Sequence, residues 1–195
     1  MEYLINLPGL LVAIIFHELA HGYTAYRLGD PTAKDAGRLT LNPIKHIDPV
    51  GFLFMLVFRF GWAKAVPINP GYFKNRKRDT ILVSLAGVTT NFILAFIIGA
   101  ILVNVPLKNE IVTQMLQMGL WYNIMLGVFN ILPFPPLDGS KVVASLLPIK
   151  WEAFFYKNER YFYFILLFLI ATRMIQKIIG PLIIFVFNFI IRILM

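Results

Sequence analysis

The chain contains no cysteine among its 195 residues, and it has few charged side chains. The absence of cysteine excludes disulfides, thiolate metal sites and cysteine nucleophiles, and it leaves the redox compartment undetermined. Only 14% of the residues are charged and 58% are hydrophobic, whereas soluble domains have roughly 25% and 45–50%. A chain of this size has too little interior to bury so much apolar surface. We therefore expect an integral membrane protein.

Acidic residues are also scarce. The 10 aspartates and glutamates stand against 18 lysines and arginines, which gives a formal net charge of +8. On an apolar chain this excess indicates cytoplasmic loops beside anionic lipid headgroups. A nucleic-acid partner is not expected, because membrane topology explains the basic cluster at residues 74–78 better than nucleic-acid binding does. The lipid bilayer is the expected environment.

Long apolar stretches predict the helices. A hydrocarbon core of about 30 Å requires roughly 20 predominantly apolar residues in a helix, and residues 3–26, 81–103 and 111–132 meet this length. Residues 161–172 and 178–195 could form two spans, one broken span, or a span and an interfacial helix. The sequence thus predicts an all-α polytopic membrane protein with four to six transmembrane or re-entrant helices.

The segment between the first two spans does not have a helical pattern. Residues 38–41 alternate polar and apolar side chains, which predicts a short membrane-associated β element resembling an edge strand. Residues 51–58 are apolar but too few to cross, so we expect a re-entrant or interfacial loop there. All of these elements are expected to belong to one integral-membrane domain over residues 1–195.

Basic residues predict the orientation of the spans. Residues 74–78 carry four lysines and arginines, whereas the loop at 104–110 has one lysine and one glutamate. By the positive-inside rule the first loop faces the cytoplasm. The amino terminus is then expected outside, with the first helix running inward, the second outward and the third inward.

Three ionisable side chains, His17, Glu18 and His21, interrupt the first apolar stretch. Such groups are costly in a span and mark functional sites. Histidines four residues apart are separated by about 40° around a helix and one turn along it, so both imidazoles can reach one metal ion. Glu18 is placed to accept a proton from water on that ion. The alternative, in which each histidine only satisfies a backbone carbonyl, does not offset the desolvation of three titratable groups.

A catalytic zinc usually takes a third protein ligand. His17 follows about 14 residues of apolar helix, which is about 21 Å into a core of about 30 Å and nearer the cytoplasmic face. The third span runs inward and meets a proline-rich break near that depth, directly before Asp138. Asp138 is therefore the predicted third ligand, although a carboxylate there could instead cap the next helix. His46 and Asp48 are the alternative ligands.

The two motifs together resemble the site-2 protease family of intramembrane zinc metalloproteases, in its compact form without a PDZ or CBS domain. The resemblance rests on F-H-E-L-A-H-G at residues 16–22 and N-I-L-P-F-P-P-L-D-G at residues 130–139. It extends to residues 37–49, 66–73 and 84–91. The paired motifs are much more specific than H-E-x-x-H alone.

This resemblance implies one zinc ion per chain, held by His17, His21 and Asp138, with Glu18 as the catalytic base. It implies hydrolysis of peptide bonds in or near transmembrane helices of membrane protein substrates. The expected location is the cytoplasmic membrane of a prokaryotic cell, and the depth of His17 places the active site nearer the cytoplasmic face. No oligomeric state is predicted.

Two asparagines in the predicted spans, Asn91 and Asn130, are candidates for holding the substrate backbone or a developing oxyanion. Alternatively, they make interhelical polar contacts. Two other classes of function are weighed against a protease. A membrane metal-ion transporter would show several polar positions along a pathway and an internal repeat, and a catalytically silent scaffold would lack part of the motif. The sequence shows neither feature.

Overall fold

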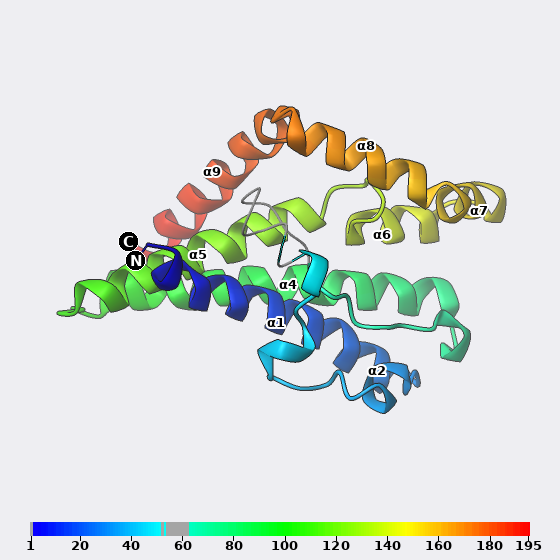
Figure 1. Ribbon diagram of the computed structural model, residues 1–195, viewed down its shortest axis with the longest axis horizontal. Helices are drawn as coiled ribbons and strands as arrows, with labels where there is room; N and C mark the ends of the chain where they lie inside the picture. Colours follow the sequence, from blue (N-terminus) through cyan, green and yellow to red (C-terminus); the bar gives the residue numbers. More distant parts are fainter. Residues whose placement is uncertain (1, 52, 54–62) are drawn as a thin grey trace.

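The computed structural model describes residues 2–51, 53 and 63–195, and these residues are mostly helical (Figure 1). The long helices are α1 (Glu2–Arg27), α4 (Arg76–Asn104), α5 (Glu110–Asn130) and α9 (Met174–Leu194). The shorter helices are α2 (Thr32–Asp35), α6 (Asp138–Leu146), α7 (Ile149–Lys157) and α8 (Glu159–Ala171), with 3₁₀ turns η1 (Pro43–Lys45) and η2 (Pro70–Tyr72).

Asparagine caps determine where two of the long helices begin. The side chain of Asn75 accepts a hydrogen bond from the Arg78 amide at the start of α4, and Asn109 accepts from two amides at the start of α5. These contacts satisfy N–H groups that have no partner inside the helix. Asp79 and Glu110 lie in the respective first turns, where negative charge is favourable.

Helices α1, α4 and α5 pack against one another, and α6 packs on α4. Helices α1 and α4 run in opposite directions, and both chain termini lie at the same end of the bundle (Figure 1). Helix α9 contacts α4 and α5, and α8 contacts α9. Because α4 lies at the centre of these contacts, it is the element against which the α1 and α6 side chains are placed.

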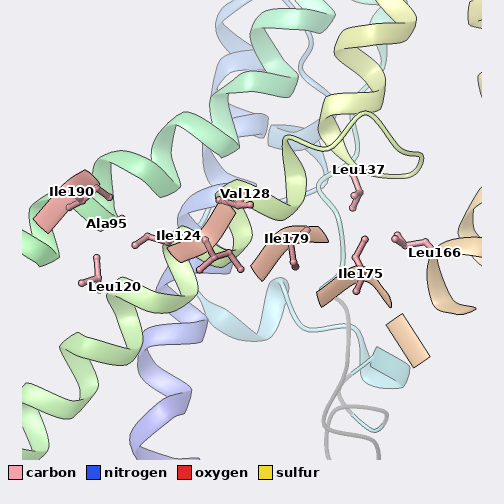
Figure 2. Close-up of a cluster of buried hydrophobic side chains, with 10 residues drawn as sticks. Ala95, Leu120, Ile124, Val128, Leu137, Leu166, Ile175, Ile179 and Ile190 are labelled. Carbon is pink, nitrogen blue, oxygen red and sulfur yellow. The ribbon is translucent and has the colours of Figure 1, made fainter. Parts of the chain in front are cut away.

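The main apolar core joins the second half of the chain to α4. It is built from buried side chains on α4, α5, α8 and α9, and Figure 2 shows most of them converging between the helices. They are Ala95, Leu120, Ile124, Val128, Leu137, Leu166, Ile175, Ile179, Ile183 and Ile190. Leu137, in the segment before α6, is the member next to Asp138. This packing therefore anchors the chain where α6 begins.

Length and composition single out three described helices that could cross a membrane, at Ile5–Arg27, Arg76–Asn104 and Met174–Leu194. The membrane character of the chain is thereby confirmed, whereas the predicted count of four to six is not. Helix α5 forms as predicted but is not among the three helices. Helix α8 has 13 residues, too few to cross.

A backbone break separates the last two apolar stretches. Arg173 adopts a left-handed backbone conformation with φ of 58° and separates α8 from α9. Pro181 lies inside α9, which continues to Leu194. The two stretches are therefore a short helix and one spanning-length helix.

The predicted edge strand at residues 38–41 is not formed. In the described part of the chain, the β pairing is an isolated antiparallel bridge between Ile47 and Ala63. The Thr40 carbonyl group is bound by a side chain and not by a neighbouring strand: His46 Nε2 lies 2.8 Å from the Thr40 oxygen. The loop predicted at residues 51–58 falls almost entirely outside the described residues.

Candidate metal centre

The two histidines of the helical motif face the same point, as their spacing predicts. His17 and His21 are 6% and 5% exposed on α1, and their Nε2 atoms lie 2.9 Å apart. The two rings are nearly perpendicular, at 86°. One turn of helix thus presents two imidazole nitrogens to a single position in the protein interior.

Asp138 brings a carboxylate to the same point from the first residue of α6. Its Oδ2 atom lies 3.1 Å from His17 Nε2 and 3.0 Å from His21 Nε2. The turn before α6 is tight, because a Cβ at Gly139 would collide with the Ile131 carbonyl oxygen and lie 2.5 Å from that of Leu132. This close backbone approach requires glycine, and it places the neighbouring carboxylate beside α1.

The residues fit a zinc ion. Tetrahedral zinc with bonds of about 2.0–2.1 Å separates its ligand atoms by about 3.4 Å, so small outward movements of the three side chains would accommodate it. Imidazole and carboxylate groups are ordinary zinc ligands, and three of them leave a fourth position open. Among the described residues, these three form the group that could hold a metal ion.

The outer nitrogens of both rings are bonded to oxygen acceptors. His21 Nδ1 lies 2.7 Å from the Val83 carbonyl oxygen, and His17 Nδ1 lies 2.6 Å from Asn91 Oδ1. A carbonyl oxygen can only accept, so each Nδ1 carries the proton and donates it. Each Nε2 is then an unprotonated nitrogen that faces the cluster, which is the form that binds a metal.

Asn91 is completely buried, and its amide group is fully used. Its Oδ1 accepts from His17, while Nδ2 donates to the Ala13 carbonyl and to Asn123 Oδ1, at 3.0 and 2.9 Å. No hydrogen remains on this amide for a substrate. These are the interhelical polar contacts that were the alternative prediction for Asn91, and one of them accepts the Nδ1 proton of His17. Sequence analysis did not single out Asn123, whose partner on α4 is far away in the chain.

Helix α4 passes directly beside the two histidines. A Cβ built at Gly87 would lie 2.5 Å from His21 Nε2 and 2.7 Å from His17 Cε1. A side chain at this position would occupy the space of the imidazoles. The absence of a side chain at Gly87 is therefore part of what admits the metal centre.

Glu18 is half-buried on α1, and a backbone amide binds its carboxylate. Its Oε2 atom accepts a hydrogen bond of 2.7 Å from the Val66 amide. Val66 belongs to the irregular segment that precedes η2. The bond fixes one carboxylate oxygen and leaves Oε1 for another proton donor.

The other predicted residues lie elsewhere. His46 bonds to the Thr40 carbonyl, and Asp48 accepts from the Gly51 amide at 2.8 Å, so the contacts described for both are hydrogen bonds within their own segment. Asn130 donates to the Leu126 carbonyl at 3.1 Å, along its own helix. Lys141 was not predicted; its Nζ lies 3.3 Å from Asp138 Oδ1. This positive charge favours the ionised carboxylate that binds a metal.

The sequence of the chain is similar to those of known proteins. Residues 105–173 match the family described as peptidase family M50, a range that includes Asp138 but not the histidines. The chain is also 41% identical over 180 residues to the "Putative zinc metalloprotease YwhC" of Bacillus subtilis, covering 88% of this chain and 82% of that protein.

The chain belongs to peptidase family M50. This M50 peptidase is also 32% identical over 146 residues to the "Putative zinc metalloprotease Rip2" of Mycobacterium tuberculosis, covering 68% of this chain and 53% of that protein. It is 31% identical over 156 residues to the "Putative zinc metalloprotease MJ0611" of Methanocaldococcus jannaschii, covering 79% and 73%. No solved structure matches it significantly.

These matches confirm the resemblance drawn from the two motifs. The M50 peptidase is a metalloprotease of the site-2 protease family, and zinc is its cofactor. Three spanning-length helices among its described residues make it an integral membrane protein that lies in a lipid bilayer.

Proposed function

We propose that this M50 peptidase hydrolyses peptide bonds in or near the transmembrane helices of other membrane proteins. In this proposal His17, His21 and Asp138 hold the zinc ion, and Glu18 is the catalytic base. The observation that carries it is the convergence of three buried ligand atoms, 2.9 to 3.1 Å apart, from two helices distant in the chain.

The protein residues divide the chemical work. Zinc, when bound, supplies a Lewis acid that polarises the scissile carbonyl and makes water a stronger nucleophile. Glu18 takes the proton of the attacking water at Oε1 and then gives it to the leaving amine. The Val66 amide holds Oε2 meanwhile. Peptide hydrolysis then needs no covalent intermediate with the enzyme.

The substrate must be locally unwound before it reacts. Inside an intact helix, before its last turn, each backbone carbonyl is hydrogen-bonded within the helix, which is why helices are stable in lipid. The three ligand residues are 5–6% exposed, so only an extended segment of substrate can approach them. Asn130 at the carboxyl end of α5 is a candidate to contact such a segment, because its side chain is only partly buried.

The centre is proposed to lie toward the cytoplasmic side of a prokaryotic cytoplasmic membrane. Gly87 and Val83, which touch the histidines, lie in the first half of α4. That helix begins beside the basic residues 74–78. Because basic loops are retained in the cytoplasm, water from that side has the shorter path to the site.

Two substitutions in the purified protein test the proposal. Glu18→Gln is expected to keep one zinc per chain and to lose at least about a hundredfold in cleavage of a single-span substrate, because the base is removed and the ligands remain. Asp138→Ala is expected to lose zinc and cleavage together. Metal content is measured by elemental analysis and cleavage by gel.

Asp48→Ala is the matched control, since it removes a carboxylate that the structure places in a loop; it is expected to retain zinc and activity. Parental cleavage by Glu18→Gln would contradict the assigned base. Full zinc content in Asp138→Ala would contradict the ligand set.

A further inference from the structure

Arg38 is a buried cation whose guanidinium group binds two backbone carbonyl groups. It is 5% exposed, and its Nη2 and Nη1 atoms donate to the carbonyl oxygens of Lys64 and Ala65, at 2.6 and 3.1 Å. The two acceptors are consecutive. A planar guanidinium with donors in a fixed fork therefore holds two successive peptide groups at once.

The backbone segment that Arg38 binds also binds the carboxylate of Glu18. The Ala65 carbonyl and the Val66 amide belong to the same peptide group, and the Val66 amide donates to Glu18 Oε2 at 2.7 Å. A peptide group is planar and rigid, so fixing the direction of its C=O also fixes the direction of its N–H. Arg38 bonds one end of this unit and Glu18 bonds the other.

The bonds from Arg38 also strengthen the hydrogen bond between the Val66 amide and Glu18. A charged donor on a carbonyl oxygen makes a stronger bond than a neutral donor, and it polarises the peptide so that its N–H is a better donor. Burying a guanidinium costs free energy. The Lys64 amide already ties this segment to the His46 carbonyl, at 2.9 Å, so the segment has a neutral anchor besides the arginine.

We propose that Arg38 is a positioning residue for the catalytic base: through the Ala65–Val66 peptide group it fixes Oε2 of Glu18 and so directs Oε1 toward the proton it must accept. The inference rests on the proposed role of Glu18. Arg38 touches neither substrate nor metal in this account. A merely structural role would instead affect folding and zinc binding along with turnover.

The first test separates kcat, KM and zinc content in two variants. Arg38→Gln is expected to keep one zinc per chain and a KM within about twofold, while kcat falls roughly 10–100-fold, because small misplacements of a catalytic group are costly. Arg38→Lys keeps the charge without the fork and is expected to recover part of kcat. Arg78→Gln removes an exposed arginine and is the control, with parental values expected.

The second test removes the amide donor itself. Val66→Pro has no N–H to offer Glu18 and is expected to retain zinc and lower kcat as Arg38→Gln does. The double variant is expected to be no slower than the slower single variant, because both changes act on one hydrogen bond, whereas independent effects on the barrier would multiply.

Three results would overturn the inference: parental kcat in Arg38→Gln, loss of zinc in Arg38→Gln, or multiplied losses in the double variant. None of these results depends on the ligand assignment. Failure of the proposed function is recognised separately, by cleavage in Glu18→Gln or zinc retention in Asp138→Ala.

Discussion

Asn91 shows how a single side chain can support the candidate metal centre by binding the outer nitrogen of a histidine. It accepts from His17 and donates to Asn123, whose own amide donates to the Gly119 carbonyl at 2.8 Å. The chain of bonds thus runs from the His17 ring on α1, across α4, into the backbone of α5. Every member is buried, so the orientation of the His17 ring depends on the packing of all three helices.

Replacing Asn91 by leucine is expected to weaken zinc binding about 10–100-fold, because partners of metal-binding histidines contribute that much to affinity. The His17 Nδ1 proton would lose its acceptor, and the ring its fixed orientation. Zinc affinity is measured by competition with a chelator. Asn104→Leu, at the exposed end of the same helix, is the control. Equal affinities in the two variants would refute this role.

At the residue scale, the sequence predicted the contacts between side chains of one helix. It missed a role that depends on how several helices pack together. His17, Glu18 and His21 lie within one helical turn and a half, so their spacing alone determines that two imidazoles meet. Asp138 required a depth argument, which the 3.0 Å contact with His21 supports. The role of Asn91 depends on partners on α1 and α5, and no pattern along α4 could reveal it.

Among the elements, the turn between α5 and α6 matters most to the site. It carries the carboxylate, and its backbone is folded so tightly that Gly139 meets the carbonyl groups at the end of α5. The apolar side chain of Leu137 packs into the main core. The turn therefore positions Asp138 in two ways. The residue after it, Gly139, is in close backbone contact with the end of α5, and the residue before it, Leu137, is buried in the core.

Gly139→Ala is expected to destabilise the protein by at least about 1–3 kcal/mol and to lower zinc affinity, since overpacking against backbone forces the turn to shift. Thermal unfolding in detergent and chelator competition measure the two effects. Gly180→Ala is the matched control: a Cβ there meets nothing within 4 Å, and in a helix alanine is favoured. Parental zinc affinity in Gly139→Ala would be the contrary result.

The helices were predictable where hydrophobic runs and breaks are strong. The apolar run at residues 81–103 and its basic start correspond to α4, and the proline cluster correctly ended α5. The strand predicted at residues 38–41 was wrong. Alternating polar and apolar side chains indicate a segment with one buried face, and a loop packed on α1 has such a face as well as a strand does. Leu39 and Val66 lie so close to α1 that a Cβ at Gly22 would touch both.

For the whole molecule, the distribution of basic residues predicts which way it lies in the membrane. The two ends of α4 differ in charge: residues 74–78 are basic, whereas residues 104–110 carry one lysine and one glutamate. The metal centre is nearer the basic end. The orientation therefore decides from which compartment water and the cleaved products exchange with the site.

The absence of cysteine makes this orientation directly measurable, because a single introduced thiol is the only one in the chain. Arg78→Cys places that thiol at an exposed position in the first turn of α4, and Lys108→Cys places it at an exposed position in the loop after α4. In intact cells an impermeant maleimide is expected to label Lys108→Cys and to label Arg78→Cys only after the membrane is opened, because lysine and arginine are retained on the cytoplasmic side. Labelling of Arg78→Cys alone in intact cells would reverse the orientation and move the metal centre toward the outer face.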